Sequence, residues 1–308
     1  MNKVKYSIII PVYNAENTLQ TLINKIADTF SNITSSYEII MVEDCGKDNS
    51  WSVMNQLLTQ FSNIKIIKLM KNYGQHNALL CGFINSRGEY VITIDDDLQH
   101  PPEEIPKLIA KMHEGYDIVY GVYQQKRHNM FRNFGSEFIQ YIYKSTFNLS
   151  NKLTSFRIMT RQLVDLISSY EYNYTFIDGL VAWYTRNIGE VIVEHKEREH
   201  STSNYTIYKL LNLAFNMITN FSVTPLRICS VIGFSFSLIG LVLALFYSIK
   251  YFFFGIPVMG YTSTIITITI LSGIQLLMIG MIGEYLGRIH LNINRNPQFA
   301  IREIKEKK

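Results

Sequence analysis

The sequence contains little cysteine, and its few cysteines are not spaced for metal or redox chemistry. Among 308 residues there are three, an odd number, at Cys45, Cys81 and Cys229. Zinc sites and redox pairs place two cysteines a few residues apart, and small secreted domains need an even, dense set. These classes are excluded, and we expect reduced thiols facing a cytosol.

A strong charge of either sign is also absent. The 29 Lys and Arg residues outnumber the 25 Asp and Glu residues by only four, and this excess is dispersed along the chain. Proteins that bind nucleic acid carry a concentrated basic surface, so we expect no nucleic-acid partner. The N-terminus lacks the apolar core and cleavage site of a secretory signal peptide, so we expect that it is not exported.

Two long runs towards the C-terminal end contain no charged residue. They cover residues 228–247 and 262–282, about 20 and about 21 residues, and each can cross the hydrocarbon core of a bilayer. The alternative is a buried helical hairpin in a soluble core, but two such runs in tandem are rare inside a domain of this size. The sequence therefore predicts two transmembrane helices.

The charges around these runs predict their orientation. Lys209 and Arg227 precede the first run and several basic residues follow the second, whereas the turn at 254–261 has no charge. Basic residues concentrate on the cytoplasmic side, so we expect a multi-pass protein of the inner (plasma) membrane with both termini cytoplasmic. Lys250 departs from this pattern, but near a helix end it can reach the far interface.

The first 200 residues have the pattern of an α/β domain. β-Branched and aromatic runs at 6–11, 37–43, 64–69, 90–94 and 117–120 alternate with helical patterns at 18–30, 50–61, 75–84 and 101–113. This alternation predicts a mostly parallel, doubly wound sheet. We expect a cytoplasmic domain at 1–200, a juxtamembrane amphipathic segment at 201–226, a transmembrane hairpin at 227–290 and a basic cytoplasmic tail at 291–308.

Polar side chains follow four of the predicted strands. These groups are Pro11-Val12-Tyr13-Asn14, Glu43-Asp44, Lys71-Asn72-Tyr73 and Asp95-Asp96-Asp97-Leu98-Gln99. Any one of them could be a solvated loop or a helix cap. Because ligands of such sheets lie beyond the carboxyl ends of the strands, the four groups together predict one site.

The acidic triplet Asp95-Asp96-Asp97 is the most specific of these groups. The repulsion between its carboxylates falls if a divalent cation is held there. Side chains alternate in an extended segment, so Asp95 and Asp97 would face one way and Asp96 back towards the protein. Oxygen ligands suit Mg²⁺ or Mn²⁺, and Gln99 could add a neutral one. The alternative is a solvated acidic turn.

Together these motifs resemble a known family. The strand leading to Pro11-Val12-Tyr13-Asn14, the Glu43-Asp44 pair and the acidic triplet with its following Leu-Gln-His-Pro-Pro-Glu look like the inverting glycosyltransferases of family 2, which have a GT-A domain. Further motifs resemble its polyprenyl-phosphate branch: dolichol-phosphate mannose synthases, bactoprenol glucosyltransferases and, most closely, undecaprenyl-phosphate formamido-arabinose transferases. These are Asn72-Tyr73-Gly74-Gln75-His76, His195-Lys196-Glu197-Arg198-Glu199, Thr224-Pro225-Leu226-Arg227 and Gly283-Glu284-Tyr285-Leu286-Gly287-Arg288-Ile289.

This resemblance covers nearly the whole chain and implies a site. It places the nucleotide at Pro11, Tyr13, Asp44 and Asp95. It assigns the metal-bound diphosphate to Asp97 and Gln99, so that Asp95, Asp97 and Gln99 form the metal set for Mg²⁺ or Mn²⁺ and Asp97 is catalytic. The residues allow this, since a tyrosine ring can stack on a base and a carboxylate can accept from a base N–H.

Three positions depart from the family pattern. Cys45 follows Asp44 where a glycine is common, Asn204 replaces a frequent lysine, and Ser155 replaces an acidic residue that many relatives carry before Phe-Arg. That acidic residue is sometimes proposed as a general base. A phosphate acceptor is already largely anionic at cytosolic pH, so it does not require one.

A phosphate acceptor needs cations instead. Arg132, Arg157 and Arg198 are the candidates, because a guanidinium group binds phosphate through a bidentate fork. For each of them a surface charge or an interfacial anchor is the alternative. The aromatic stretch at 134–147, after Arg132, has the weak amphipathic pattern of a segment in the headgroup region.

The function predicted is the inverting, metal-dependent transfer of a hexose-type sugar from a nucleotide-diphosphate sugar to polyprenyl (undecaprenyl) phosphate. The cytoplasmic membrane face is the expected location, a cell-envelope glycan or lipid the expected destination, and a homo-oligomer is left open. A processive polysaccharide synthase is disfavoured because two spans form no evident polymer channel and the Gln-X-X-Arg-Trp signature is absent. The remaining alternative is a catalytically degenerate membrane protein that carries lipid or recruits partners.

Overall fold

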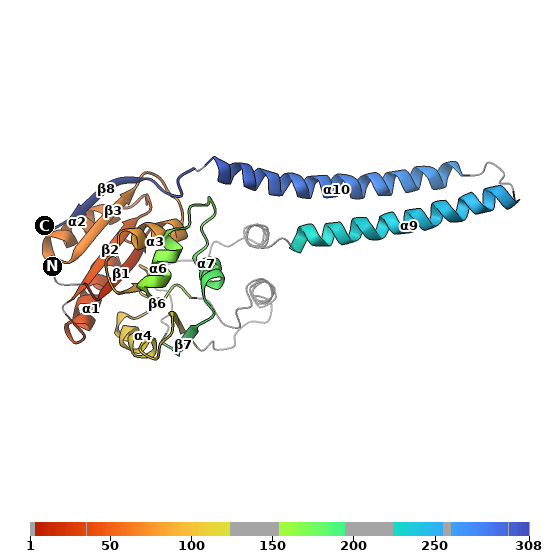
Figure 1. Cartoon of the computed structure of the whole chain (residues 1–308). Helices are drawn as coiled ribbons and strands as arrows, with labels where there is room; N and C mark the ends of the chain where they lie inside the picture. Colours follow the sequence, from red (N-terminus) through yellow and green to blue (C-terminus); the bar gives the residue numbers. More distant parts are fainter. Residues whose placement is uncertain are drawn as a thin grey trace. The chain divides into compact units, whose positions relative to one another are not determined.

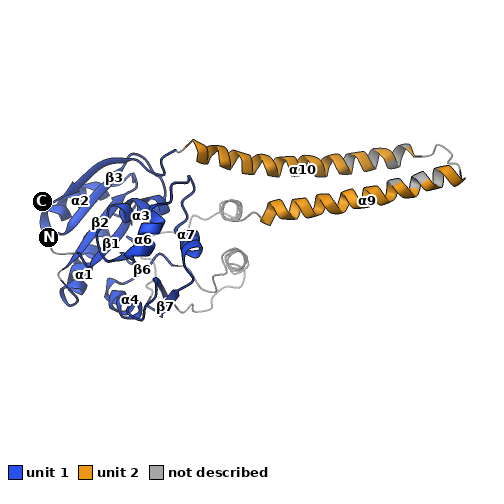
Figure 2. Cartoon of the chain, viewed as in Figure 1, with its two compact units in different colours: residues 1–205, 295–308 blue, residues 206–294 orange. Residues whose placement is uncertain are grey.

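A computed structural model describes residues 4–34, 36–123, 154–194, 224–254, 260–294 and 296–307. The chain forms two compact units (Figure 2). The first combines residues 1–205 with residues 295–308, and the second covers residues 206–294. The C-terminal residues therefore belong to the same unit as the N-terminal domain.

A mixed β-sheet forms the centre of the first unit (Figure 1). Its order is β7-β5-β6-β4-β1-β2-β3-β8, and β6 and β8 run antiparallel to their neighbours whereas the other pairs are parallel. The strands are β1 (Tyr6–Val12), β2 (Tyr37–Glu43), β3 (Ile64–Leu69), β4 (Tyr90–Thr93), β5 (Ile118–Val122), β6 (Arg157–Thr160), β7 (Ile188–Ile192) and β8 (Ile301–Glu306). The predicted α/β class with a mostly parallel sheet is confirmed.

Helices cover both faces of this sheet (Figure 1). On one face lie α1 (Leu19–Ser31), α2 (Ser50–Gln60), the short 3₁₀ helix η1 (Pro102–Glu104) and α4 (Ile105–Met112); on the other lie α3 (Gln75–Ile84), α6 (Arg161–Ser168) and α7 (Ile177–Tyr184).

The central strand β1 explains why both faces are covered. All seven of its residues are buried, as in a strand with no solvent-facing side. Ile8 and Ile10 belong to the core beneath α1, whose apolar residues recur at helical spacing. Ile9 faces α3, where Gly82 approaches so closely that a Cβ there would be 2.3 Å from Ile9 Cγ2.

The C-terminal residues, which the sequence predicts as a basic tail at 291–308, include a strand of the sheet. Residues Ile301–Glu306 form β8, which pairs with β3 so that Ile304 lies opposite Ile67. Lys305 Nζ lies 5.4 Å from the centre of the Trp51 ring, and the Glu306 carboxylate pairs with Arg87. The sequence does not predict β8 because its many charged residues are typical of a solvated tail. Its partner strand also lies more than 200 residues earlier in the chain.

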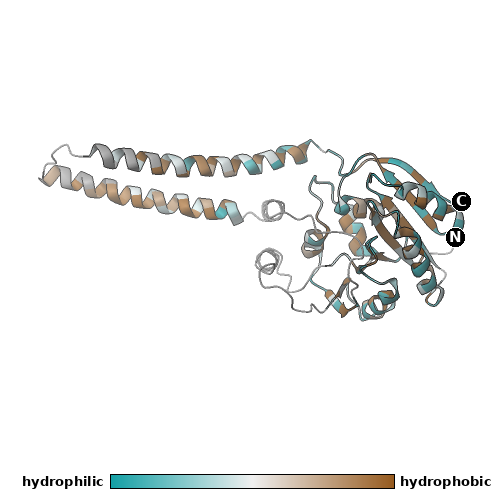
Figure 3. Cartoon of the chain, turned by 180° about the vertical axis from the view of Figure 1, so that it is seen from behind, coloured by the Kyte–Doolittle hydropathy of each residue, from teal (hydrophilic) through white to brown (hydrophobic). Residues whose placement is uncertain are grey.

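The second unit contains two long helices, α9 (Thr224–Phe254) and α10 (Tyr261–Ile293). Each includes a stretch long and apolar enough to cross a membrane, Thr224–Leu243 and Ile270–Ile293, and almost none of either stretch is buried. Apolar residues lie along the described parts of both helices (Figure 3). The predicted runs 228–247 and 262–282 fall inside these helices, whereas most of the predicted juxtamembrane segment lies outside the described residues.

Candidate active site

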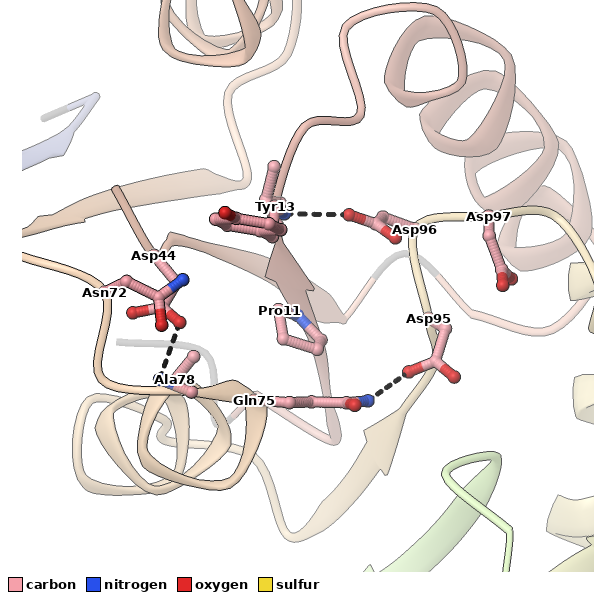
Figure 4. A pocket seen from close by; sticks show the side chains of 11 residues that line it. Pro11, Tyr13, Asp44, Asn72, Gln75, Ala78, Asp95, Asp96 and Asp97 are labelled. Atoms are coloured by element: carbon pink, nitrogen blue, oxygen red, sulfur yellow. Dashed lines mark hydrogen bonds between the residues drawn. The ribbon is translucent and has the colours of Figure 1, made fainter. Parts of the chain in front are cut away.

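A cavity of about 270 Å³ opens at the carboxyl ends of β1, β2 and β4. It is lined by Pro11, Val12, Tyr13, Asp44, Asn72, Gly74, Gln75, Ala78, Asp95, Asp96 and Asp97 (Figure 4). All four residues predicted to bind the nucleotide, and the predicted catalytic Asp97, are therefore brought together. Gln99 is not among the lining residues.

Asp44 fixes the loop that follows β3. This residue is 3% exposed, and its two carboxylate oxygens accept hydrogen bonds from the backbone N–H groups of Tyr73 at 2.7 Å and Gly74 at 2.8 Å. Burial raises the pKa of Asp44, and the two N–H groups counteract part of that rise. Gly74 has a φ of +87°, which favours glycine and lets the chain turn into α3. Asp44 therefore has a structural role beside the predicted contact to a base.

The acidic triplet lies in a turn rather than in an extended segment. The chain turns at Asp96 and Asp97, and Leu98 has a φ of +60°. The expected alternation of side chains therefore does not explain their directions. Asp96 Oδ2 instead accepts a hydrogen bond from the Tyr13 backbone N–H at 2.9 Å, so this carboxylate ties the end of β1 to the turn after β4 (Figure 4).

The Asp96 carboxylate lies between two other carboxylates and is largely removed from water. Burial raises its pKa to about 7, and the charges of Asp95 and Asp97 add to this effect. The N–H of Tyr13 acts in the opposite direction because it stabilises the carboxylate form. The negative charges of Asp95 and Asp97 therefore disfavour ionisation of the Asp96 carboxyl group between them. A cation bound at the turn would reduce this repulsion.

Both carboxylate oxygens of Asp95 accept a hydrogen bond from a side chain. Gln75 Nε2, from the first turn of α3, donates to Oδ1 at 2.7 Å, and Ser155 Oγ donates to Oδ2 (Figure 4 shows the Gln75 contact). Ser155 reaches this edge because β6 runs antiparallel to β4, with Arg157 opposite Thr93. Sequence reasoning missed both roles: Gln75 appeared only within a family motif, and Ser155 only as the loss of an acid.

The donor set at the turn fits a divalent cation shared with a substrate. Asp95 and Asp97 supply hard carboxylate oxygens, and the Gln99 backbone N–H donates to Asp97 Oδ1 at 3.1 Å. Among the described residues no three Asp, Glu, His or Cys side chains converge as a complete metal site would require. Mg²⁺ in phosphate-binding sites needs only one or two protein carboxylates, because phosphate oxygens and water complete its coordination.

Arg157, one of the three arginines predicted to bind the acceptor phosphate, lies inside the domain. Its side chain is 1% exposed and pairs with Asp178 at the start of α7. Tyr120 Oη donates to the same carboxylate at 3.0 Å, and the Tyr120 ring centre lies 5.9 Å from the guanidinium carbon. Arg157 therefore belongs to a buried charge cluster under the site. The other two predicted arginines, Arg132 and Arg198, lie outside the described residues.

Comparison with known proteins identifies the family. Residues 7–168 match the family model described as "Glycosyl transferase family 2". The chain belongs to glycosyl transferase family 2. It is 35% identical over 303 residues to the undecaprenyl-phosphate 4-deoxy-4-formamido-L-arabinose transferase of Pseudomonas savastanoi pv. phaseolicola, covering 97% of this chain and 90% of the relative. It is 33% identical over 306 residues to the enzyme of that name from Enterobacter sp. (strain 638), covering 97% and 93%.

A solved structure shows the same fold. The glucosyl-3-phosphoglycerate synthase of Mycobacterium tuberculosis, in complex with Mn²⁺, uridine diphosphate and glucosyl-3-phosphoglycerate, matches 70% of this chain and 77% of its own with a TM-score of 0.53. The sequence identity of this pair is 17%, so the likeness concerns the fold. The predicted GT-A fold and the prediction of a glycosyltransferase are both confirmed.

Proposed function

We propose that this family 2 glycosyltransferase moves a sugar from a nucleotide-diphosphate sugar to polyprenyl phosphate, with inversion at the anomeric carbon. The observation that carries the proposal is the convergence of Tyr13, Asp44, Asp95 and Asp97 on one cavity at the strand ends. The acceptor is inferred from relatives over nearly the full length, which are named as undecaprenyl-phosphate sugar transferases.

The donor fits the cavity through its two parts. The Tyr13 ring, 48% exposed, offers a face on which a base can stack. The acidic turn would hold the diphosphate through a divalent cation on Asp95 and Asp97, and a cation there would offset the charge that develops on the leaving diphosphate. A protein of the same fold binds Mn²⁺ together with uridine diphosphate, which supports this arrangement.

The reaction of the acceptor phosphate requires mainly that the protein position it beside the anomeric carbon of the sugar. A phosphate oxygen attacks the anomeric carbon on the face opposite the diphosphate, and the bond to the diphosphate oxygen breaks with its electron pair. Because the phosphate is already ionised, no side chain must remove a proton. Ser155, which occupies the place of an acidic residue in many relatives, instead donates to Asp95. This substitution suits a phosphate acceptor, because only a hydroxyl acceptor would benefit from a general base at this position.

Helices α9 and α10 would hold the enzyme in the membrane that contains its acceptor. Strand β8 follows α10 in the chain but pairs with β3, which precedes α9. A chain that returns to its own sheet must cross a bilayer an even number of times, which favours two crossings. We place the sheet and both termini in the cytoplasm, where nucleotide sugars are made. A cysteine in place of Gly260 should be labelled by an impermeant thiol reagent in intact cells, and one in place of Lys307 should not.

The function is tested with the purified full-length chain in lipid nanodiscs. Undecaprenyl phosphate and Mn²⁺ are supplied with each of a panel of labelled nucleotide sugars, and labelled lipid is measured after extraction. We expect one sugar to be transferred and chelation of the metal to stop the reaction. Nucleotide-sugar binding without transfer to lipid from any donor would contradict the proposal and favour a degenerate transferase that carries lipid or recruits partners.

A further inference from the structure

The first unit exposes a group of large aromatic side chains on and before α7. Tyr172 is 57% exposed, Trp183 52% and Tyr184 39%. Tyr170 packs edge-on against Tyr172, with ring centres 5.3 Å apart, and against Trp183 at 6.4 Å. Tyr184 follows Trp183 directly and is the last residue of α7. We call Tyr170, Tyr172, Trp183 and Tyr184 the aromatic patch.

The composition of the aromatic patch indicates a partner surface that has both apolar and hydrated polar groups. Tyrosine and tryptophan combine a large apolar ring with an O–H or N–H group, which suits the boundary between lipid chains and water. None of these four side chains lines the cavity at the strand ends. The exposed Arg186, two residues after the patch, adds a cation that suits phospholipid phosphates.

The chain connection to α10 distinguishes a lipid partner from a protein partner. Gln298 Nε2 donates to the backbone carbonyls of Tyr170 at 2.9 Å and Tyr172 at 2.6 Å. Helix α10 ends at Ile293, so only residues 294–297 separate it from this anchor. Even fully extended, that connection reaches no more than about 18 Å. If α10 crosses the membrane along its apolar stretch Ile270–Ile293, the aromatic patch is tied to the place where the chain leaves the bilayer.

We propose that the aromatic patch is a membrane-docking surface whose rings lie among phospholipid headgroups. This inference rests on the membrane placement of α10 in the proposed function, and it adds a contact from the folded domain itself. Docking of the aromatic patch would limit the rotation of the first unit about the chain segments that connect it to the membrane helices. The donor cavity would then stay within a narrow range of heights above the layer that holds the acceptor phosphate.

The two tryptophans of the chain allow a direct test. Trp51→Phe leaves Trp183 as the single tryptophan, and Trp183→Phe leaves Trp51, which lies on α2 beside Lys68 and Lys305, on the opposite face of the sheet from α7. Each full-length variant is reconstituted into liposomes of plain phosphatidylcholine and of phosphatidylcholine brominated near the headgroup. We expect brominated lipid to quench the Trp183 emission strongly and to leave the Trp51 emission unchanged.

Two outcomes would overturn the proposal. One is quenching of Trp183 no greater than that of Trp51 in protein that floats with the liposomes, which would leave the membrane placement and the proposed function intact. The other is a Trp183 emission that ignores brominated lipid but changes on dilution of the protein, which would identify a protein interface. Extraction of the chain from membranes by alkaline carbonate would instead contradict the proposed function. Adding Tyr172→Ser and Tyr184→Ser to Trp51→Phe should weaken the quenching.

Discussion

Ser155 Oγ donates a hydrogen bond to Asp95 Oδ2, and this contact joins the start of β6 to the end of β4. The backbone carbonyl of Ser155 in turn accepts a hydrogen bond from Thr93 Oγ1, which holds the serine in place. Gln75 Nε2 donates to the other carboxylate oxygen, so residues from both α3 and the segment before β6 hold Asp95. Ser155 is thus a positioning residue for the acidic turn.

Replacing Ser155 should lower the catalytic efficiency with the nucleotide sugar and the affinity for the metal without unfolding the protein. We expect Ser155→Ala to lower kcat/KM for the nucleotide sugar about tenfold, about 1.4 kcal/mol, and to raise the Mn²⁺ concentration needed for half-maximal activity. Ser155→Thr keeps the hydroxyl and should restore most of both. Ser62→Ala, at an exposed serine outside the cavity, is the matched control. An unchanged Mn²⁺ requirement in Ser155→Ala would refute the positioning role.

The Asp97 carboxylate should be essential for transfer. Asp97→Asn keeps the size of the side chain but removes the charge, and we expect transfer to fall at least about a hundredfold, about 2.7 kcal/mol in the barrier. Asp165→Asn, on the exposed face of α6, should leave transfer unchanged. The measurement is the rate of labelled lipid formation at saturating Mn²⁺. A rate near that of the unmodified enzyme would exclude the role assigned to Asp97.

The buried pair of Arg157 and Asp178 should stabilise the fold rather than bind the acceptor. Asp178→Ala leaves a guanidinium group that is 1% exposed without its carboxylate, and such losses cost about 3 to 5 kcal/mol. We expect a large fall in the thermal midpoint. Asp165→Ala breaks the exposed pair with Arg161, worth less than about 1 kcal/mol, and serves as the control. Equal midpoints for the two variants would contradict this assignment.

His76 should make stability depend on pH in the mildly acidic range. Its ring lies against Phe176, with ring centres 5.1 Å apart, and burial lowers its pKa from 6.5 to about 4, although Asp178 acts in the opposite direction. Between pH 6.5 and pH 4 this histidine is protonated in the unfolded chain but neutral in the folded chain. The free energy of unfolding therefore decreases as the pH falls through this range, by at most about 1.4 kcal/mol per pH unit.

The test compares thermal midpoints at pH 7 and pH 5 for the unmodified enzyme and for His76→Gln. We expect the unmodified enzyme to lose more stability on acidification, because glutamine does not titrate. The same loss in both proteins would assign the acid sensitivity to other groups. The comparison must be made within each protein, since the substitution also changes packing against Phe176.

Strand β8 should be necessary for a stable catalytic unit. Removing residues 301–308 exposes the edge of β3, whose sequence Ile-Lys-Ile-Ile-Lys-Leu is mostly apolar, and open edges of this kind pair with other chains. We expect aggregation in size-exclusion chromatography and a lower thermal midpoint. Removing only residues 307–308 should do neither. Any truncation before α9 removes β8 as well as the two long helices, so a test of the helices should delete 206–294 and retain β8.

The sequence by itself determined the α/β class, the strands at the sheet centre, the two apolar helices and the acidic edge. These features follow from local patterns: hydrophobic period, uncharged run length and polar residues after buried strands. The predicted strands 37–43 and 64–69 match β2 and β3. The residues predicted to bind the nucleotide also line one cavity, because parallel strands bring their carboxyl ends to one edge of the sheet.

Only the tertiary structure decided which groups hold these residues in place. Strand β6 enters antiparallel between β4 and β5, and that order alone brings Ser155 to Asp95 and carries Arg157 inside to Asp178. Strand β8 likewise joins β3 across most of the chain. Such contacts depend on strand order and direction, which residues adjacent in sequence do not encode. In the sequence, Ser155 indicates only the loss of a possible base, whereas in the folded chain it holds Asp95. Arg157, predicted to bind phosphate, forms a buried ion pair with Asp178.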